Sequence, residues 1–440
     1  MWSVARWTMR QVEQQAPDPR SASAARKLAR PGPWSETGST EALVWGKCQG
    51  SGASPYQVSI DLTAPAFKCT CPSRKFPCKH GLALLMLWVG GEGSVAAAEA
   101  PAPFAATWAR DRVEPTERAA RKAARAGGTA DPVAKARRLE QRIERMSSGL
   151  AELERWLEDL INHGLAAARQ QPYRWWDQAA ARLVDAQLPG LADRVRAMGE
   201  AVHAEHDWAT HLLLEAGRWH LAAQAWSRRD ELPDSEMADL RTYLGWARPS
   251  DELDDRIGSR WQVVGVRRTD DGRLQAQRTW LTNLDTGSTV VSLDFAAVGG
   301  ALRVAQVVGT VIAGELCRYP GGAPERVHMP DGIKPSEHRR CLPALGSINT
   351  ALAARSAQVA GNPWIDRSPA ALAGVVVSVD GDGTGHIVDV AGDTLPLTAD
   401  TELWPLLAHA GPGPVAMFAE IDDGGVRPLT LATGGDLVAL

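Results

Sequence analysis

Four side chains that bind soft metal ions are gathered within residues 69–80 of this chain. They are arranged as Cys69-x-Cys71, then six residues, then Cys78-x-His80, with the apolar run 82–89 close behind. Three thiolates and one imidazole complete the tetrahedral donor set of a structural zinc site. Because side chains alternate along a strand, the first two sulfurs can lie on one face and reach a single ion. The pattern predicts a strand, a turn and a helix held together by one zinc ion.

Two other interpretations of these cysteines remain open at this point. They could be reduced thiols that fill a core, although charged residues and prolines stand between them, which is unusual for core positions. They could also form a disulfide, but near neighbours such as Cys69 and Cys71 are poorly placed to bond each other. The N-terminal residues have no apolar stretch of the kind a secretion signal needs, so reduced thiols are expected.

The spacing of the four residues and the hydrophobic segment after them resemble the SWIM zinc finger. The similarity covers residues 42–88 and includes an upstream segment with the pattern of a β-hairpin. The resemblance implies zinc binding and contact with DNA or other proteins, and it implies no catalysis. By this resemblance the zinc ligands are Cys69, Cys71, Cys78 and His80, while Cys48 is a strand residue outside the pattern.

The whole chain is also similar to SWIM-containing proteins of high-GC bacteria, whose N-terminal segment resembles residues 16–34 here. Such proteins accompany AAA-type ATPases and von Willebrand A-domain proteins. The resemblance therefore implies a protein partner from a system of that type.

The length of 440 residues exceeds one core of ordinary size, so several domains are expected. The patterns predict an α+β multidomain protein with an N-terminal ββα zinc-finger module, a central helical bundle and a C-terminal antiparallel β-rich part. The expected domains are 1–93 (SWIM-type module), 94–130 (Ala/Pro-rich basic linker), 131–250 (helices), 251–370 (β-rich) and 371–440 (small OB-like barrel). No apolar run approaches the roughly 20 residues that cross a bilayer, so a cytoplasmic protein is expected.

Charge is divided unevenly along the chain. Residues 1–145 carry 22 Lys and Arg against 13 Asp and Glu, a net +9, and the remainder carries a net −13. The basic part permits contact with nucleic acid or an acidic partner. The candidate contact residues are Arg74, Lys75 and Lys79 beside the ligands and Arg118, Arg121, Lys122 and Arg125 in the linker. Alternatively, this surface is neutralised by the acidic half and the linker is inert.

Local patterns place the elements around the finger. Residues 21–30 predict a short basic helix, and 43–48 and 56–62 predict two strands on either side of a glycine-containing turn. The segment after the ligands carries leucines on every side of a helix. A helix of that kind is buried all round, so the finger is expected to pack against more protein than its own residues.

A long helix is predicted from Asp131-Pro132 onward. Its apolar residues recur every three or four positions: Leu139, Ile143, Met146, Leu150, Leu153, Leu157 and Leu160. Such a seam could form a coiled coil, but a helix within one bundle is favoured because the sequence predicts further helices over 175–188, 191–203, 206–216 and 221–229. The tryptophans at 175, 176, 208, 219 and 226 are expected to anchor its core. His203, His206 and His211 do not share one helical face and are interpreted as surface or capping residues.

Strand patterns dominate after residue 249. Strands are predicted over 261–266, 274–284, 289–295, 302–308 and 311–317, and a helix over 345–359. The last segment predicts strands over 375–379, 386–390, 394–397, 415–421 and 427–431 with a short helix over 402–408, an order compatible with a five-stranded OB-type barrel. Asp380 and Asp382 resemble the start of a calcium loop, but Ala391 stands where a glutamate ligand is needed, so a hairpin turn is favoured.

No nucleophile elbow, phosphate-binding loop or paired acid and base is recognisable in the sequence. The leading hypothesis is a non-enzymatic, zinc-stabilised interaction or scaffold protein. The second hypothesis is a DNA-binding protein that uses the basic loop and linker. An enzyme concealed in the β-rich half is a third possibility without a motif to support it.

Overall fold

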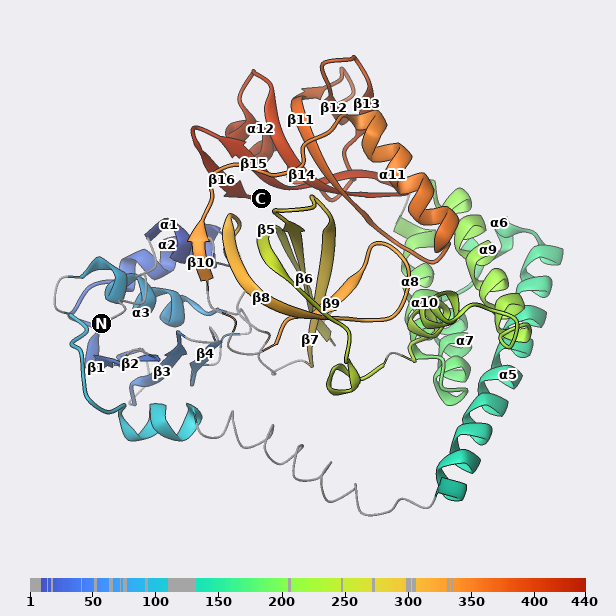
Figure 1. The fold of residues 1–440 in the computed structure, drawn as a ribbon, viewed down its shortest axis with the longest axis horizontal. Coiled ribbons are helices and arrows are strands. Elements are labelled where there is room, and N and C mark those ends of the chain that lie inside the picture. The colour runs from blue at the N-terminus through green and yellow to red at the C-terminus, as the bar shows by residue number, and fades with distance from the viewer. Residues whose placement is uncertain are drawn as a thin grey trace.

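The structure of this chain is a computed structural model. It describes residues 9–13, 15–16, 19–40, 42–50, 54–62, 66–71, 73, 77–91, 94–109, 132–204, 207–246, 248–270, 274–297, 302, 306–330, 333 and 335–440. The elements form an N-terminal module, a helical bundle and two six-stranded sheets (Figure 1). Among the described residues, no helix is long and apolar enough to span a membrane.

The N-terminal module is a four-stranded antiparallel sheet covered by helices. Its elements are α1 (Met9–Glu13), α2 (Pro19–Leu28), β1 (Trp34–Ser39), β2 (Leu43–Cys48), β3 (Tyr56–Asp61), β4 (Ala66–Cys69) and α3 (Lys79–Gly90). The strands pair in chain order, and α3 contacts both α2 and the sheet. The predicted helix over 21–30 and the predicted strands over 43–48 and 56–62 are therefore confirmed.

Helix α3 is buried on every side, as its leucines indicated. Leu82, Leu84 and Leu85 are inaccessible to solvent. Their core cluster includes Val12 from α1 and Ala25 from α2 as well as residues of the sheet. The finger therefore packs against protein outside its own residues, which confirms the expectation.

Residues 94–109 differ from the linker that their composition predicts. Ala97 forms a parallel bridge with Ser39, and residues 103–109 form a short helix. On that helix, Ala105 and Trp108 are buried against Trp45 of β2. One tryptophan and a few alanines are thus enough to cover this face of the sheet, although larger aliphatic residues are scarce. The rest of the predicted linker, 110–130, lies outside the described residues.

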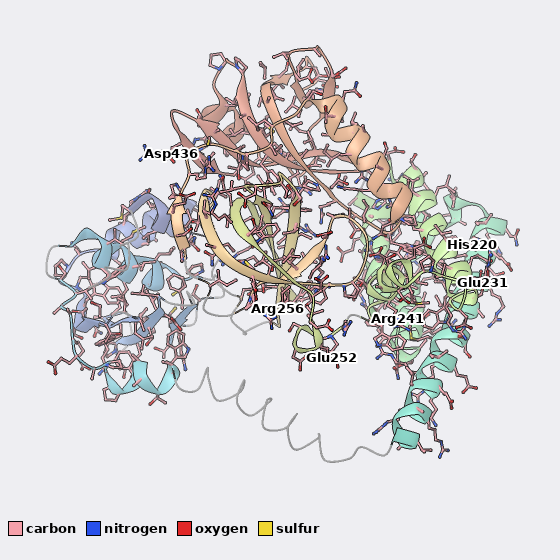
Figure 2. The ribbon with its side chains drawn as sticks, in the orientation of Figure 1. His220, Glu231, Arg241, Glu252, Arg256 and Asp436 are labelled. Atoms are coloured by element: carbon pink, nitrogen blue, oxygen red, sulfur yellow. The ribbon has the colours of Figure 1, made fainter. Side chains whose placement is uncertain are left out.

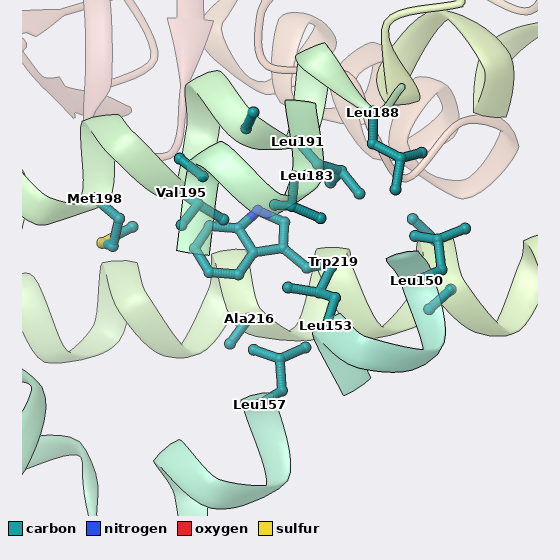
Figure 3. Close-up of a cluster of buried hydrophobic side chains, with 14 of the residues drawn as sticks. Leu150, Leu153, Leu157, Leu183, Leu188, Leu191, Val195, Met198, Ala216 and Trp219 are labelled. Carbon is teal, nitrogen blue, oxygen red and sulfur yellow. The ribbon is translucent and has the colours of Figure 1, made fainter. Parts of the chain in front are cut away.

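The central region is a bundle of helices. They are α5 (Pro132–His163), α6 (Leu165–Gln170), α7 (Tyr173–Asp185), α8 (Pro189–Ala204), α9 (Trp208–Ser227) and α10 (Asp234–Leu244). Figure 3 shows Trp219 of α9 surrounded by Leu153 and Leu157 of α5, Leu183 of α7 and Val195 of α8. The apolar residues of α5 from Met146 to Leu160 therefore pack against other helices of the same chain. This confirms the prediction of a bundle helix, which was favoured over a coiled coil.

Helix α9 corrects one expectation. The sequence predicts two helices, over 206–216 and 221–229, but the structure has one continuous helix, Trp208–Ser227. Gly217 lies in its middle with open space around it, and the buried side chains of Ala216 and Trp219 on either side hold the helix against the bundle. A glycine alone costs only about 1 kcal/mol there, and this packing outweighs it.

The first β-rich unit is a small barrel. Its strands are β5 (Arg256–Asp270), β6 (Leu274–Asn283), β7 (Thr289–Ala297), β8 (Thr310–Arg318), β9 (Arg326–His328) and the edge strand β10 (Pro335–His338), and a 3-10 turn, Ser250–Glu252, precedes them. The sheet order is β10-β8-β5-β6-β7-β9, and an additional pairing of β8 with β9 closes it. β7 and β9 run parallel, whereas the other pairs are antiparallel.

The strand predicted over 302–308 is not found in the described residues of that range. Residues 302 and 306–308 lie in loop and turn, although the side chains of Leu302 and Val308 are buried. The apolar pattern therefore reflected burial of a connecting segment, which periodicity alone cannot distinguish from a strand.

The last unit repeats this connectivity. Its elements are α11 (Ile348–Gly361), β11 (Ser368–Val379), β12 (Gly385–Val388), β13 (Thr394–Pro396), α12 (Leu403–Ala410), β14 (Val415–Asp422), β15 (Gly425–Thr433) and β16 (Asp436–Ala439). The order is β13-β12-β11-β14-β15-β16, and a parallel bridge between Leu397 and Val426 brings the third strand to the fifth. This is the partly open five-stranded barrel that the sequence predicts, with β16 added at its edge.

Residues 380–385 form the turn of the β11–β12 hairpin, in which Asp382 accepts a hydrogen bond from the Thr384 N–H. The hairpin interpretation of this acidic stretch is therefore confirmed.

The bundle and both barrels pack together. Phe418 and Leu429 of the second barrel belong to the core cluster of the first. Arg194 of α8 donates two hydrogen bonds, of 2.8 and 2.9 Å, to Asp366 in the segment before β11. Apolar contacts thus join the two barrels, and an ion pair joins the second barrel to the bundle.

Candidate metal centre

The four predicted ligands come from two elements of the N-terminal module. Cys69 is the last residue of β4 and Cys71 follows it by two positions. Cys78 is the N-cap residue of α3, and His80 lies in its first turn. The sheet and the buried helix therefore deliver the ligands from opposite sides of one site.

The ligand atoms of these residues all lie within 4.8 Å of one another. The Sγ of Cys69 is 3.8 Å from the Nδ1 of His80. Zinc bonded to sulfur at about 2.3 Å and to nitrogen at about 2.0 Å in a tetrahedron would separate such atoms by roughly 3.5 Å. The donor set and its spacing are consistent with one structural zinc ion.

Burial of the four residues is unequal. Cys78 and His80 are buried, whereas Cys69 and Cys71 are half-buried. The ring of Tyr56 on β3 lies 5.0 Å from the His80 ring, centre to centre, and helps to fix the imidazole. An ion held here would be closed in by four protein ligands, which leaves no coordination position for a reacting water.

Hydrogen bonding between the thiols moves the pKa values of Cys78 and Cys69 in opposite directions. A hydrogen bond from Cys69 lowers the pKa of Cys78, against the effect of burial, and the Gly81 N–H at the start of α3 lowers it further. The pKa of Cys69 is raised, first by its hydrogen bond with Cys78 and then by burial. A thiolate at the beginning of a helix is thus already favoured, as expected where backbone N–H groups converge.

Sequence reasoning missed two residues that shape this site. Gly81 is required because a Cβ there would lie 2.9 Å from the Phe67 ring of β4. Tyr56, described above, is the second. The glycine directly after the histidine was a visible signal, since a helix start that approaches a strand this closely needs a residue without a side chain.

Of the predicted contact residues, the structure describes Lys79. Lys79 is exposed at the first position of α3, beside the ligands. Arg74, Lys75, Arg118, Arg121, Lys122 and Arg125 lie outside the described residues. Cys48 is buried at the end of β2, as a strand residue, and is not one of the four clustered ligands. His203 is exposed and His211 is half-buried, and His206 is not described.

Comparison with protein families decides what this centre is. Residues 56–88, which contain β3, β4 and α3, match the SWIM zinc finger. The chain contains a SWIM zinc finger. The matched range begins later than the expected one, so β2 supports the SWIM finger from outside it.

A second match covers residues 141–244 and corresponds to the SWIM-associated four-helix bundle domain. It includes α6 to α10 and most of α5. Comparisons with curated proteins and with solved structures gave no match. The two domain matches do not test the expected origin in high-GC bacteria, which stays a prediction.

Proposed function

We propose that this chain is a non-enzymatic interaction or scaffold protein, in which the SWIM finger holds together an N-terminal module that contacts other proteins. The observation that carries this proposal is the closed Cys3His donor set, formed between β4 and the N-terminus of α3. A closed structural site contributes folding energy and offers no open position for chemistry. Zinc therefore acts here as a structural ion that links β4 to α3.

The burial of α3 limits where recognition can occur. Its residues from His80 to Trp88 are used for internal packing, so a partner must bind elsewhere on the module. The exposed Lys79 beside the ligands and the basic loop that contains Arg74 and Lys75 are the proposed contact region. A partner with an acidic surface fits the net charge of +9 in residues 1–145.

The proposed partner is a protein of an AAA-type ATPase or von Willebrand A-domain system, and the proposed location is the cytoplasm. The test is an affinity pull-down of the full chain from its native host, followed by reconstitution with the purified partner. Loss of the complex in Lys79→Glu, with retention in Arg228→Glu on the helical bundle, supports the proposal. The proposal is contradicted when Lys79→Glu, Arg74→Glu and Lys75→Glu all leave reconstitution of the complex unchanged.

DNA binding is the second candidate, because the basic charge is concentrated around the finger and in 110–130. Phosphate contacts by Lys79 and the linker arginines would give binding that weakens steeply with salt. A mobility-shift titration at low salt tests this function. DNA binding predicts a shifted band that is weaker with Lys79→Glu. The absence of any shifted band rejects DNA binding.

A further inference from the structure

We propose that four arginines at the junction of the two barrels form a binding site for a phosphate group. They are Arg267 on β5, Arg278 on β6, Arg367 just before β11 and Arg427 on β15. All four belong to one ion-pair network around the buried Glu420 of β14. The site lies apart from the SWIM finger in sequence and uses none of its residues.

Two of the arginines face the same side of the first barrel. Arg267 and Arg278 are direct partners in the antiparallel register of β5 and β6. Like charges placed directly opposite one another on a sheet destabilise it unless a counter-charge is near. Arg267 donates a 2.8 Å hydrogen bond to Asp400, and Arg278 donates one of 3.2 Å to Glu420. Each arginine thus depends on a carboxylate of the second barrel.

Those carboxylates are shared with the other two arginines. Arg427 donates to Asp400 at 2.6 Å and to Asp422 at 3.3 Å. The Nε of Arg367 lies 3.5 Å from Glu420 and 3.6 Å from Asp422. Among the described residues, these three carboxylates are shared by four guanidinium groups. Asp366, which pairs with Arg194, is a further carboxylate that interacts with Arg278 and Arg367.

The network also leaves hydrogen-bond donors unused. The Nε atoms of Arg267, Arg367 and Arg427 are buried and make no hydrogen bond within the described structure, and neither does Glu420 Oε2, which lies 3.5 Å from the Arg367 Nε. An unmade hydrogen bond on a buried charged group is unfavourable. Burial, followed by repulsion from Arg427, lowers the pKa of Arg267. The cluster is therefore incompletely satisfied as it stands.

Solvent reaches the arginines before it reaches the central carboxylate. The side chains of Arg278 and Arg367 are 21% and 30% exposed, whereas Glu420 is fully buried. The buried Trp280 indole donates a 2.8 Å hydrogen bond to Glu420. Asp400, which pairs with Arg267 and Arg427, is 50% exposed, so an anion from solvent would reach the cluster through Arg278 and Arg367.

Phosphate fits this arrangement better than a simple halide. Guanidinium groups bind tetrahedral oxyanions through pairs of parallel hydrogen bonds, and a dianion offsets the Arg267–Arg278 repulsion. The phosphate could be free or carried by a small phosphomonoester such as a mononucleotide. Either source presents the same group to the cluster.

The test uses the full, zinc-loaded chain and inorganic phosphate at ionic strength held constant with sodium chloride. Calorimetric titration and thermal unfolding should show binding and a raised Tm that chloride does not reproduce. Arg367→Gln should weaken phosphate binding by about tenfold or more, because it removes a charge-assisted contact. Arg278→Gln should do the same where it folds. The matched control is Arg228→Gln, whose exposed side chain pairs with Glu231. Figure 2 labels Glu231 on the helical bundle.

A parallel titration with adenosine monophosphate distinguishes the two sources. Tighter binding of the mononucleotide, with the same loss in Arg367→Gln, assigns a phosphomonoester ligand, and tighter binding of inorganic phosphate assigns the free ion. The proposal is overturned when neither compound binds more tightly than chloride, or when Arg367→Gln binds phosphate as well as Arg228→Gln. Neither result bears on the structural zinc site, which is tested separately by the metal content of the chain.

Discussion

Gly81 of α3 and Phe67 of β4 are in such close contact that the glycine has no room for a side chain. A Cβ on Gly81 would lie 2.9 Å from the Cδ1 of Phe67. This contact sets the distance between the start of α3 and the end of β4, and those two points carry the zinc ligands. The geometry of the metal site is therefore determined in part by packing next to it.

Gly81→Ala should destabilise the N-terminal module by about 1–3 kcal/mol, because the added methyl group forces the helix and strand apart. Gly90→Ala in the same helix is the matched control, since nothing lies within 4 Å of its Cβ position. The control should be neutral or stabilising by up to about 1 kcal/mol. Chemical unfolding followed by tryptophan fluorescence measures both, and equal stabilities of the two variants would contradict the packing argument.

Removal of zinc with a chelator should loosen the N-terminal module and leave the helical bundle intact. The metal joins β4 to α3, whereas the core around Trp219 contains none of the described residues of the module. Binding energy of a structural zinc is largely folding energy. Hydrogen exchange should show that amides of β4 and α3 lose protection while those of α5 and α9 keep theirs. Loss of protection in all of them would show that the two parts unfold together.

Trp219→Ala should destabilise the bundle by about 3–5 kcal/mol, because it removes a fully buried indole from the centre of the helices. Trp404→Ala on α12 removes the same atoms from a side chain that is 80% exposed, and its effect should stay within about 0.5 kcal/mol. Thermal unfolding of the two variants compares them directly. A larger loss for Trp404→Ala would mean that its surface is covered in the folded protein.

Asp423 connects α9 to the second barrel and should give stability that depends on pH. Burial alone would raise its pKa, but Arg218 and Arg355, which donate to it at 2.6 Å each, hold the pKa below its ordinary value. A lowered pKa contributes stability above the unfolded value of about 3.9, and this contribution disappears as pH falls through the lower folded value.

Asp423→Asn should therefore reduce stability at pH 7, and the difference from the unmodified chain should shrink between pH 4 and pH 3. Asp230→Asn, at an exposed turn, is the control and should change little at either pH. Urea unfolding at several pH values gives the comparison. A difference that stays constant down to pH 3 would exclude the ion pairs as its source.

The sequence predicted those parts of this protein that depend on local signals. The four ligands, the all-round apolar helix after them and the seam of α5 each follow from spacing within a few turns or strands. Gly217 misled the prediction because a glycine between two apolar stretches looks like a break, whereas the buried Trp219 keeps α9 continuous. Packing between distant residues decided that case.

Long-range pairing explains most of what the sequence could not supply. The parallel bridge of Leu397 with Val426 and the pairing of β8 with β9 close the two barrels, and neither has a local pattern. The arginine cluster was missed for the same reason, since Arg278 and Glu420 are 142 positions apart. Of the two residues of the metal site that sequence reasoning missed, Gly81 had a readable signal.

The zinc content of the purified chain tests the central claim most directly. The account predicts about one zinc per chain, and it predicts that Cys78→Ser, which removes a buried ligand, loses the metal. Cys341→Ser is the matched control, because that exposed cysteine stands outside the cluster and the variant should retain its zinc. A content below about 0.5 zinc per chain that Cys78→Ser leaves unchanged would contradict the account.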